Sequence, residues 1–277
     1  MSHVITMIKA RRWLILRRIS QLSIMFLFLL GPLFDYWILK GNLSSSLFLD
    51  KIPMSDPYLL LQSWLAGHDL FKTALIGGLI IFSLYFLIGG RVYCSWVCPL
   101  NIVTDLAAWI REKLNIKGKK RQFSPNRFIR YWVLALTLLL SMVSGVLVWE
   151  TINPVSLLHR GILFGMGIGW LVILFIFLFD IFISPRGWCG HLCPVGAFYS
   201  LIGFFSLVKV NAVNRQQCDD CMDCYAVCPE PQVLKPALKG EKNGITPLIA
   251  SGNCTNCFRC IDVCSVNVFK MGLRFNK

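Results

Sequence analysis

The sequence is poor in charge and in histidine, and it lacks several common cofactor motifs. Only 15% of its 277 residues are charged, well below the share found in ordinary soluble domains. None of the four histidines falls inside a long apolar run, so no haem b is expected between membrane helices. There is no C-x-x-C-H motif, which excludes an attached c-type haem. There is no P-loop either, so nothing points to a nucleotide.

Acidic residues are scarce as well: 14 stand against 28 lysines and arginines, for a net charge of +14. The basic residues are unevenly placed. Twenty-four of them fall on one side of a four-span arrangement and four on the other, which is the bias of a cytoplasmic membrane face. Such a face attracts anionic lipid. The charge therefore predicts membrane lipid as a partner, and no nucleic acid.

Four apolar runs are each long enough to cross a bilayer: residues 19–39, 73–90, 131–149 and 161–183. They predict an α-helical membrane protein with four transmembrane helices in a membrane domain of residues 1–210. The basic bias predicts a multi-pass protein with both termini in the cytoplasm. No cleavage site follows the basic N-terminal stretch, so the first run is expected to remain as an anchor.

The twelve cysteines form four groups, with none left over. Eight of them make two runs of spacing C-x-x-C-x-x-C-x-x-x-C, the pattern of bacterial ferredoxins with two [4Fe–4S] clusters. In that pattern the fourth cysteine of each run binds the other cluster. The predicted ligands are Cys218, Cys221, Cys224 and Cys264 for cluster 1, and Cys254, Cys257, Cys260 and Cys228 for cluster 2.

A pair of zinc sites is the alternative for these runs, but the spacing of the cysteines would place four zinc ligands in an unfavourable order. Ser265 stands where a proline usually follows the last cysteine, and that proline does not bind iron. The predicted cytoplasmic side keeps thiols reduced, which favours metal ligation over disulfides. Residues 211–277 are therefore expected to form a small α+β ferredoxin domain with two [4Fe–4S] clusters.

The remaining cysteines lie in two C-x-x-x-C-P copies, offset by 95 residues. They are Cys94 and Cys98 in the first copy, and Cys189 and Cys193 in the second. Each copy follows an inward-running span, so the four spans are expected to form two hairpins in a parallel repeat. Each proline suits the first turn of a helix, whose N–H groups would point at the preceding cysteine. These helices are expected at the membrane interface, the second over 194–208.

Three interpretations of the C-x-x-x-C-P pairs remain open. The cysteines are ligands of a third iron–sulfur centre, or redox-active dithiols or a copper-handling site, or purely structural. Arg91 and Arg186 precede the two pairs by three residues and are expected to add positive charge beside the thiols. A basic loop is expected at 117–130.

A quinol-oxidising protein needs a proton acceptor beside an apolar pocket. Asp35, Glu150 and His159 lie at or near the outer ends of predicted spans, where ionisable groups are costly and suggest function. For Glu150 and His159 an ordinary interfacial role is the simpler interpretation, whereas Asp35 interrupts a span. Asp180 is expected at a helix end near Cys189.

Several segments besides the cysteine runs carry a family resemblance. They are GNLSSS (41–46), CSWVCPLN (94–101), WETINPVS (149–156), GWCGHLCPVG (187–196) and DVCS (262–265). With them the chain resembles, over nearly its whole length, the NapH family, the ferredoxin-type membrane subunits of the periplasmic nitrate reductase system. The resemblance implies an electron-transfer subunit of a quinol dehydrogenase complex rather than a stand-alone enzyme.

The same resemblance implies a bacterial inner membrane as the location, and it implies the partners. Electrons from quinol would pass, with a partner iron–sulfur subunit of the NapG type and a membrane-anchored c-type cytochrome where one is present, to the periplasmic nitrate reductase. Because the clusters are predicted in the cytoplasm, electrons would have to cross the membrane. The alternative function is a redox maturation or metal-handling membrane protein that uses the C-x-x-x-C-P dithiols.

Overall fold

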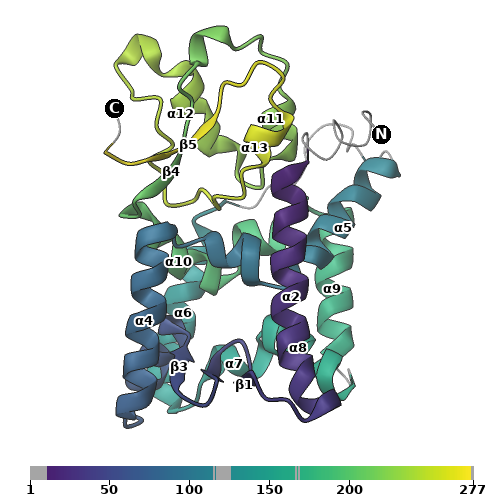
Figure 1. The fold of residues 1–277 in the computed structure, drawn as a ribbon, viewed down its shortest axis with the longest axis vertical. Helices are drawn as coiled ribbons and strands as arrows, with labels where there is room; N and C mark the ends of the chain where they lie inside the picture. The colour runs from purple at the N-terminus through teal and green to yellow at the C-terminus, as the bar shows by residue number, and fades with distance from the viewer. Residues whose placement is uncertain (1–10, 115, 117–125, 166, 168, 276–277) are drawn as a thin grey trace. The chain divides into compact units, whose positions relative to one another are not determined.

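The computed structural model describes residues 11–114, 116, 126–165, 167 and 169–275. The chain packs as two compact units. The ferredoxin unit comprises the described residues of Met1–Gln21, Leu84–Val97 and Tyr199–Lys277, and the helical unit those of Leu22–Ser83 and Cys98–Phe198. Most of the elements are helices (Figure 1).

The elements follow one another along the chain as α2 (Arg12–Phe34), β1 (Leu39–Gly41), β2 (Ser45–Phe48), β3 (Ile52–Ser55), α3 (Pro57–Leu65), α4 (Lys72–Ile88), α5 (Leu100–Lys113), α6 (Ile129–Ser144), α7 (Val148–Ile152), α8 (Pro154–Phe164), α9 (Gly169–Phe182), α10 (Pro194–Phe204), β4 (Val208–Asn211), α11 (Asp223–Val227), α12 (Leu234–Lys239), α13 (Arg259–Val263) and β5 (Lys270–Leu273). Short 3₁₀ turns lie at Arg215–Gln217, Pro231–Val233 and Glu241–Asn243.

Helix α2 is the one described helix that is long and apolar enough to cross a membrane. It has 23 residues and both begins and ends earlier than the predicted span 19–39. It ends at Phe34 because Asp35 adopts a left-handed backbone conformation, with φ at 56°, after which the chain runs into β1. Asp35 therefore follows the helix, and the prediction that it interrupts a span is wrong.

Glycines shorten two other predicted spans. Helix α6 ends before Gly145, which is left-handed (φ 67°) and donates its N–H to the carbonyl of Ser141, so 131–149 is not one helix. The run 161–183 is divided between α8 and α9, and Gly165 follows α8 with φ at 88°. Glycine reaches such angles without a Cβ clash. A count of apolar residues along the sequence does not detect a helix that ends at such a glycine.

Three of the shorter apolar helices fall in the other predicted spans. Helices α4, α6 and α9 have 17, 16 and 14 residues, against the about 20 residues of a full span. All three leave large apolar side chains exposed, among them Leu79, Leu139 and Phe175, and apolar surface of this kind suits lipid or a partner. The number of membrane spans stays a prediction.

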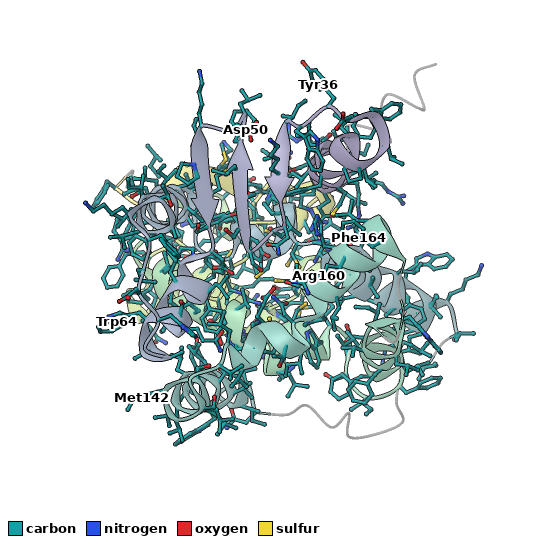
Figure 2. The ribbon with its side chains drawn as sticks, turned by 90° about the horizontal axis from the view of Figure 1, so that it is seen from below. Tyr36, Asp50, Trp64, Met142, Arg160 and Phe164 are labelled. Atoms are coloured by element: carbon teal, nitrogen blue, oxygen red, sulfur yellow. The ribbon has the colours of Figure 1, made fainter. Side chains whose placement is uncertain are left out.

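Residues 40–72, which join the first two apolar runs, are folded. Strands β1, β2 and β3 form an antiparallel sheet in that order, and Asp50 lies at the turn after β2 (Figure 2). Asp56 caps α3 by accepting the N–H of Tyr58. The hydroxyl of Tyr58 then meets that of Thr137 in α6 at 2.8 Å, which ties α3 to α6.

The two C-x-x-x-C-P copies share one local structure. A single π-helical turn, Tyr93–Val97 or Trp188–Leu192, is followed by α5 or α10, and such turns are rare and concentrate at functional sites. The helices predicted after both prolines are present, although α10 ends at Phe204 rather than 208. Of the predicted basic loop 117–130, residues 117–125 lie outside the described residues.

The ferredoxin unit is built on strand β4 paired antiparallel with β5, and α11 packs beside α13 (Figure 1). Its core side chains include Val210, Leu234, Ile249, Phe258, Val268 and Phe269. The unit is larger than the predicted domain 211–277, because residues 84–97 and the start of α2 pack with it. The carboxylate of Asp262 accepts the N–H groups of Trp13 and Leu14 at 3.1 and 3.2 Å, an anion at a helix N-terminus.

Two glycines let backbones approach closely within this unit. A Cβ added at Gly90 would lie 1.9 Å from the carbonyl oxygen of Tyr199, and one at Gly252 would lie 2.0 Å from that of Ser200. Backbone atoms cannot move aside as a flexible side chain can, so both positions require glycine.

We expect Gly90→Ala to destabilise the folded protein by about 1–3 kcal/mol, the usual cost of overpacking. The measurement is the midpoint of chemical unfolding of the purified protein in detergent. Gly190→Ala is the matched control, because a Cβ there would meet nothing within 4 Å. Equal midpoints for the two variants would contradict the close approach at Gly90.

Candidate functional site

Site 1 is a cavity lined by three cysteines of the first run and the last cysteine of the second. Cys218 and Cys221 precede α11, Cys224 lies in it, and Cys264 caps the end of α13. The space measures about 360 Å³ together with its opening to solvent. Cys221 is exposed whereas Cys224 is buried, so one edge of site 1 reaches the surface.

Site 2 is the counterpart, a cavity of about 340 Å³ counted in the same way. It is lined by Cys254, Cys257 and Cys260 of the second run and by Cys228, which caps the end of α11. Cys257 and Cys260 are buried, and Phe258 forms part of the wall. Site 2 is thus more enclosed by protein than site 1.

Each run therefore gives three cysteines to one cavity and its fourth to the other. Helices α11 and α13 pack side by side, and each ends at a fourth cysteine, which brings that cysteine to the neighbouring cavity. Four thiols around each of two cavities form the donor set that two [4Fe–4S] clusters require. The residues present fit the clusters.

Burial disfavours the charged form of these thiols. It raises the pKa of Cys224 and of Cys254 to about 11 and raises that of Cys260 as well. A metal group binds thiolates rather than thiols, so the positive charge of iron must offset the burial. Metal binding and folding are therefore expected to be coupled in this unit.

Basic side chains surround site 2. Burial acts to raise the pKa of Cys257, but Arg259 and Arg17 contribute to an overall lowering. Lys209 and Arg91 act on Cys254 in the same direction. Arg17, Arg91 and Lys209 are all buried, so their charges are little screened by solvent.

Acidic side chains line site 1 instead. Its wall includes Asp219, Asp220 and Asp223, and Asp220 forms an exposed ion pair with Lys239. The two sites thus differ in charge as well as in burial. Both properties tune the reduction potential of an iron–sulfur cluster.

The segment 91–96, which carries Cys94, is bound to the loop of site 2 by three side chains. Arg91 donates to the carbonyl of Asn253 at 2.9 Å, Ser95 to that of Thr255 at 2.8 Å, and Trp96 to that of Asn256 at 3.1 Å. Cys254 lies within this loop.

Arg91 is expected from the sequence to add positive charge beside the thiols, but it forms a buried ion pair instead. Its guanidinium forms an ion pair with Glu230 at 2.5 Å, and both side chains are almost fully buried, at 2% and 1% exposure. Glu230 also lines site 2. The charge of Arg91 is therefore balanced by a carboxylate within the ferredoxin unit and is not simply added beside Cys94.

The second copy, in the helical unit, has different surroundings. Arg186 pairs with Asp105 of α5 at 3.3 Å. The N–H of Gly196, in the first turn of α10, donates to the sulfur of Cys193 at 3.4 Å, the contact expected from a helix N-terminus. Asp180, as expected, lies near the end of its helix, where it accepts the N–H of Trp188, next to Cys189.

A network of polar side chains surrounds Glu150 in the helical unit. Its carboxylate accepts hydrogen bonds from Ser156 at 2.6 Å, from Asn153 at 3.0 Å and from Ser44 at 3.3 Å. Ser44, Asn153 and Ser156 are buried. Ser44 comes from the β1–β2 turn, and Asn153 and Ser156 come from the start of α8, so two segments converge on one carboxylate.

His159 lies one turn beyond Ser156 on α8. It is 1% exposed and packs edge-on against Phe28 of α2 at 4.7 Å. Neither ring nitrogen has a hydrogen-bond partner among the described residues. Burial, and next the charge of Arg160, lower its pKa, which favours the neutral imidazole.

Seen from below, Arg160 and Phe164 lie close together toward the middle of the view, while Tyr36, Trp64 and Met142 lie nearer its edge (Figure 2). Tyr36, Trp64, Met142 and Phe164 are all exposed. Asp35, the third expected proton acceptor, is also exposed and accepts a hydrogen bond from Trp37. The structure thus does not bring Asp35 into the Glu150 network.

Sequence reasoning missed Ser44, Asn153 and Ser156 as partners of Glu150. A signal was present, because Ser44 lies in GNLSSS and the other two in WETINPVS, two of the segments that carry the family resemblance. Within the described part of the chain, no three His, Cys, Asp or Glu side chains converge on one metal ion. In a cubane cluster each thiolate binds a different iron, so that finding concerns single-ion sites.

Two protein-family models match the chain. The model described as "4Fe-4S binding domain" matches twice, over residues 71–117 and 164–211, and so covers both C-x-x-x-C-P copies. The model described as "4Fe-4S dicluster domain" matches residues 217–268. The C-terminal segment, with its eight cysteines, thus binds two [4Fe–4S] clusters. No solved structure matches the chain.

Curated relatives cover nearly the whole chain. The ferredoxin-type protein NapH of Haemophilus influenzae is 52% identical over 96% of this chain and 92% of its own. The methylamine utilization ferredoxin-type protein MauN of Paracoccus denitrificans is 51% identical over the same shares. NapH of Escherichia coli is 46% identical over 97% of this chain and 92% of its own. With such identity over nearly its full length, the chain belongs to the NapH/MauN family of ferredoxin-type iron–sulfur electron-transfer proteins.

Proposed function

We propose that this protein is the membrane subunit of a quinol dehydrogenase complex in a bacterial inner membrane, with both termini in the cytoplasm. It takes electrons from quinol and passes them, with a partner iron–sulfur subunit and a c-type cytochrome, to a periplasmic reductase. The observation that carries the proposal is the pair of cysteine-lined cavities in a chain that is half identical to a NapH protein.

The ligands proposed for the two clusters follow the cavities. They are Cys218, Cys221, Cys224 and Cys264 at site 1, and Cys228, Cys254, Cys257 and Cys260 at site 2. When bound, the clusters supply one-electron redox chemistry. The chain fixes the thiols around each cavity, and its charged residues set the electrostatic surroundings.

Glu150 and His159 are the proposed proton acceptors for quinol. Oxidation of a quinol to a quinone releases two electrons and two protons, so a base must be near the hydroxyl groups. Glu150 is held by three hydrogen-bonding partners, which fix its orientation. His159 is buried and offers an unpartnered nitrogen among apolar neighbours.

We further propose that Cys94, Cys98, Cys189 and Cys193 hold a third iron–sulfur centre. Two observations support this over a purely structural role. The "4Fe-4S binding domain" model matches both copies, and both copies adopt a π-helical turn followed by a helix. Redox-active dithiols in a maturation or metal-handling protein are the competing function.

We favour the nitrate reductase system as the one that this protein supplies with electrons. The second candidate is an electron-transfer role in methylamine utilization. The second is favoured by the MauN proteins, which are as similar to this chain as the NapH proteins are. The two candidates give the chain the same electron-transfer role in different metabolic systems. The residues of site 1 and site 2 do not distinguish between them.

Deleting the gene should slow quinol-dependent nitrate reduction by the cells and leave growth on methylamine unchanged. The unmodified chain should restore the rate, Glu150→Gln should restore it only in part, and Glu241→Gln, at an exposed position, should restore it fully. The measurement is nitrite formation with quinol as the electron source. A normal rate in the deletion strain would sink the nitrate role, and a defect confined to methylamine would favour the second candidate.

Iron and sulfide content of the purified protein tests the third centre. Two clusters give about eight iron per chain, four for each, and a third centre adds to that number. The Cys94→Ser/Cys189→Ser double variant should lose the excess and keep the eight, because its changes lie outside both cavities. Equal iron content in the variant and the unmodified protein would exclude a centre at these pairs and leave the dithiol function.

A further inference from the structure

The first C-x-x-x-C-P copy is joined to site 2 by a run of side-chain hydrogen bonds. Segment 91–96 donates through Arg91, Ser95 and Trp96 to three backbone carbonyls within residues 253–256. All of these residues belong to the ferredoxin unit. The loop so fixed contains Cys254, a ligand proposed for site 2.

Aromatic rings continue the same connection. Trp96 packs edge-on against Phe258 with ring centroids 6.4 Å apart, and Phe258 lines site 2. Trp13 packs against both, at 6.2 Å from Trp96 and 4.5 Å from Phe258. Trp96 follows Cys94 by two residues, so bonded atoms and packed rings run from that cysteine to the wall of site 2.

The internal repeat shows that these contacts are particular to one copy. Gly190 and His191 stand in the second copy where Ser95 and Trp96 stand in the first. Glycine has no side chain to donate, and His191 meets the carbonyl of Gly187, within its own turn, at 3.3 Å. The second copy thus keeps the cysteines and the arginine but has no counterpart of Ser95 and Trp96.

The charged residues around site 1 and site 2 differ as well. Site 2 has Arg17, Lys209 and Arg259 around it, which favour the gain of an electron there, whereas three aspartates line site 1. Of the two cavities, site 2 is therefore better placed to accept electrons arriving through segment 91–96.

We propose that electrons from the membrane part of the chain reach the ferredoxin unit at site 2, through the first C-x-x-x-C-P copy and the Trp96–Phe258 contact, and that site 1 is reached only from site 2. The proposal rests on the proposed quinol dehydrogenase function. Single electrons move and no bond forms or breaks on this path. The reductant is quinol, which becomes quinone and loses two electrons and two protons.

The test follows the reduction of the two clusters by quinol with electron paramagnetic resonance on the purified full chain. Cys257→Ala, which removes a site 2 ligand, should abolish quinol reduction of the remaining cluster while dithionite still reduces it. Cys221→Ala, at site 1, should leave quinol reduction of its remaining cluster at the normal rate. Quinol reduction of the remaining cluster at the normal rate in Cys257→Ala overturns the proposal.

Trp96→Phe is a milder variant that keeps both ligand sets, and it serves if a cysteine variant does not accumulate. It keeps a ring against Phe258 but loses the hydrogen bond to Asn256, so quinol reduction of both clusters should slow severalfold at unchanged iron content. Trp109→Phe is the matched control, because Trp109 is exposed on α5. Equal rates in the two tryptophan variants overturn the proposal.

A failure of the proposed function gives a different result. In that case quinol reduces neither cluster in the unmodified protein, although dithionite reduces both. A redox titration with small mediators then tests the connection on its own, since Ser95→Ala and Trp96→Phe should shift the potential or the line shape of the site 2 signal alone. Equal shifts at both sites, or a shift at neither, overturn the connection.

Discussion

The exchange of the fourth cysteines between two short helices is the constraint on which the ferredoxin unit depends. Helices α11 and α13 have five residues each, too few to be stable alone. Each ends at the cysteine that lines the other helix's cavity. Burial opposes ionisation of these thiols, so the packing of the helices, the register of β4 with β5 and the binding of iron stabilise one another.

The second organising feature is that the two copies of the internal repeat make different contacts. Both copies keep the π-helical turn and the proline-initiated helix, which the repeated motif dictates. Their arginines differ, because Arg91 pairs with Glu230 of the ferredoxin unit whereas Arg186 pairs with Asp105 of the helical unit. Breaking a buried pair such as Arg91–Glu230 costs about 3–5 kcal/mol, so segment 91–96 is fixed to the wall of site 2.

The sequence predicts what depends on short spacings and misses what depends on distant residues. Cysteine spacing predicts the grouping around both cavities, and the prolines predict where α5 and α10 begin. The ends of α2, α6 and α8 were missed because single residues in left-handed or extended turns, Asp35, Gly145 and Gly165, end helices inside apolar runs. Ser44 and Glu150, which are in contact, lie 106 residues apart in the sequence, and no local sequence pattern predicts such a contact.

Crossed ligation is the central claim, and it is tested most directly by pairing serine variants of the cysteines. The electron paramagnetic resonance spectrum of each reduced variant shows which of the two cluster signals changes. Cys264→Ser should alter the same signal as Cys218→Ser, and Cys228→Ser the same signal as Cys254→Ser. If Cys228→Ser alters the signal of Cys218→Ser instead, each run binds its own cluster and the account of both sites is wrong.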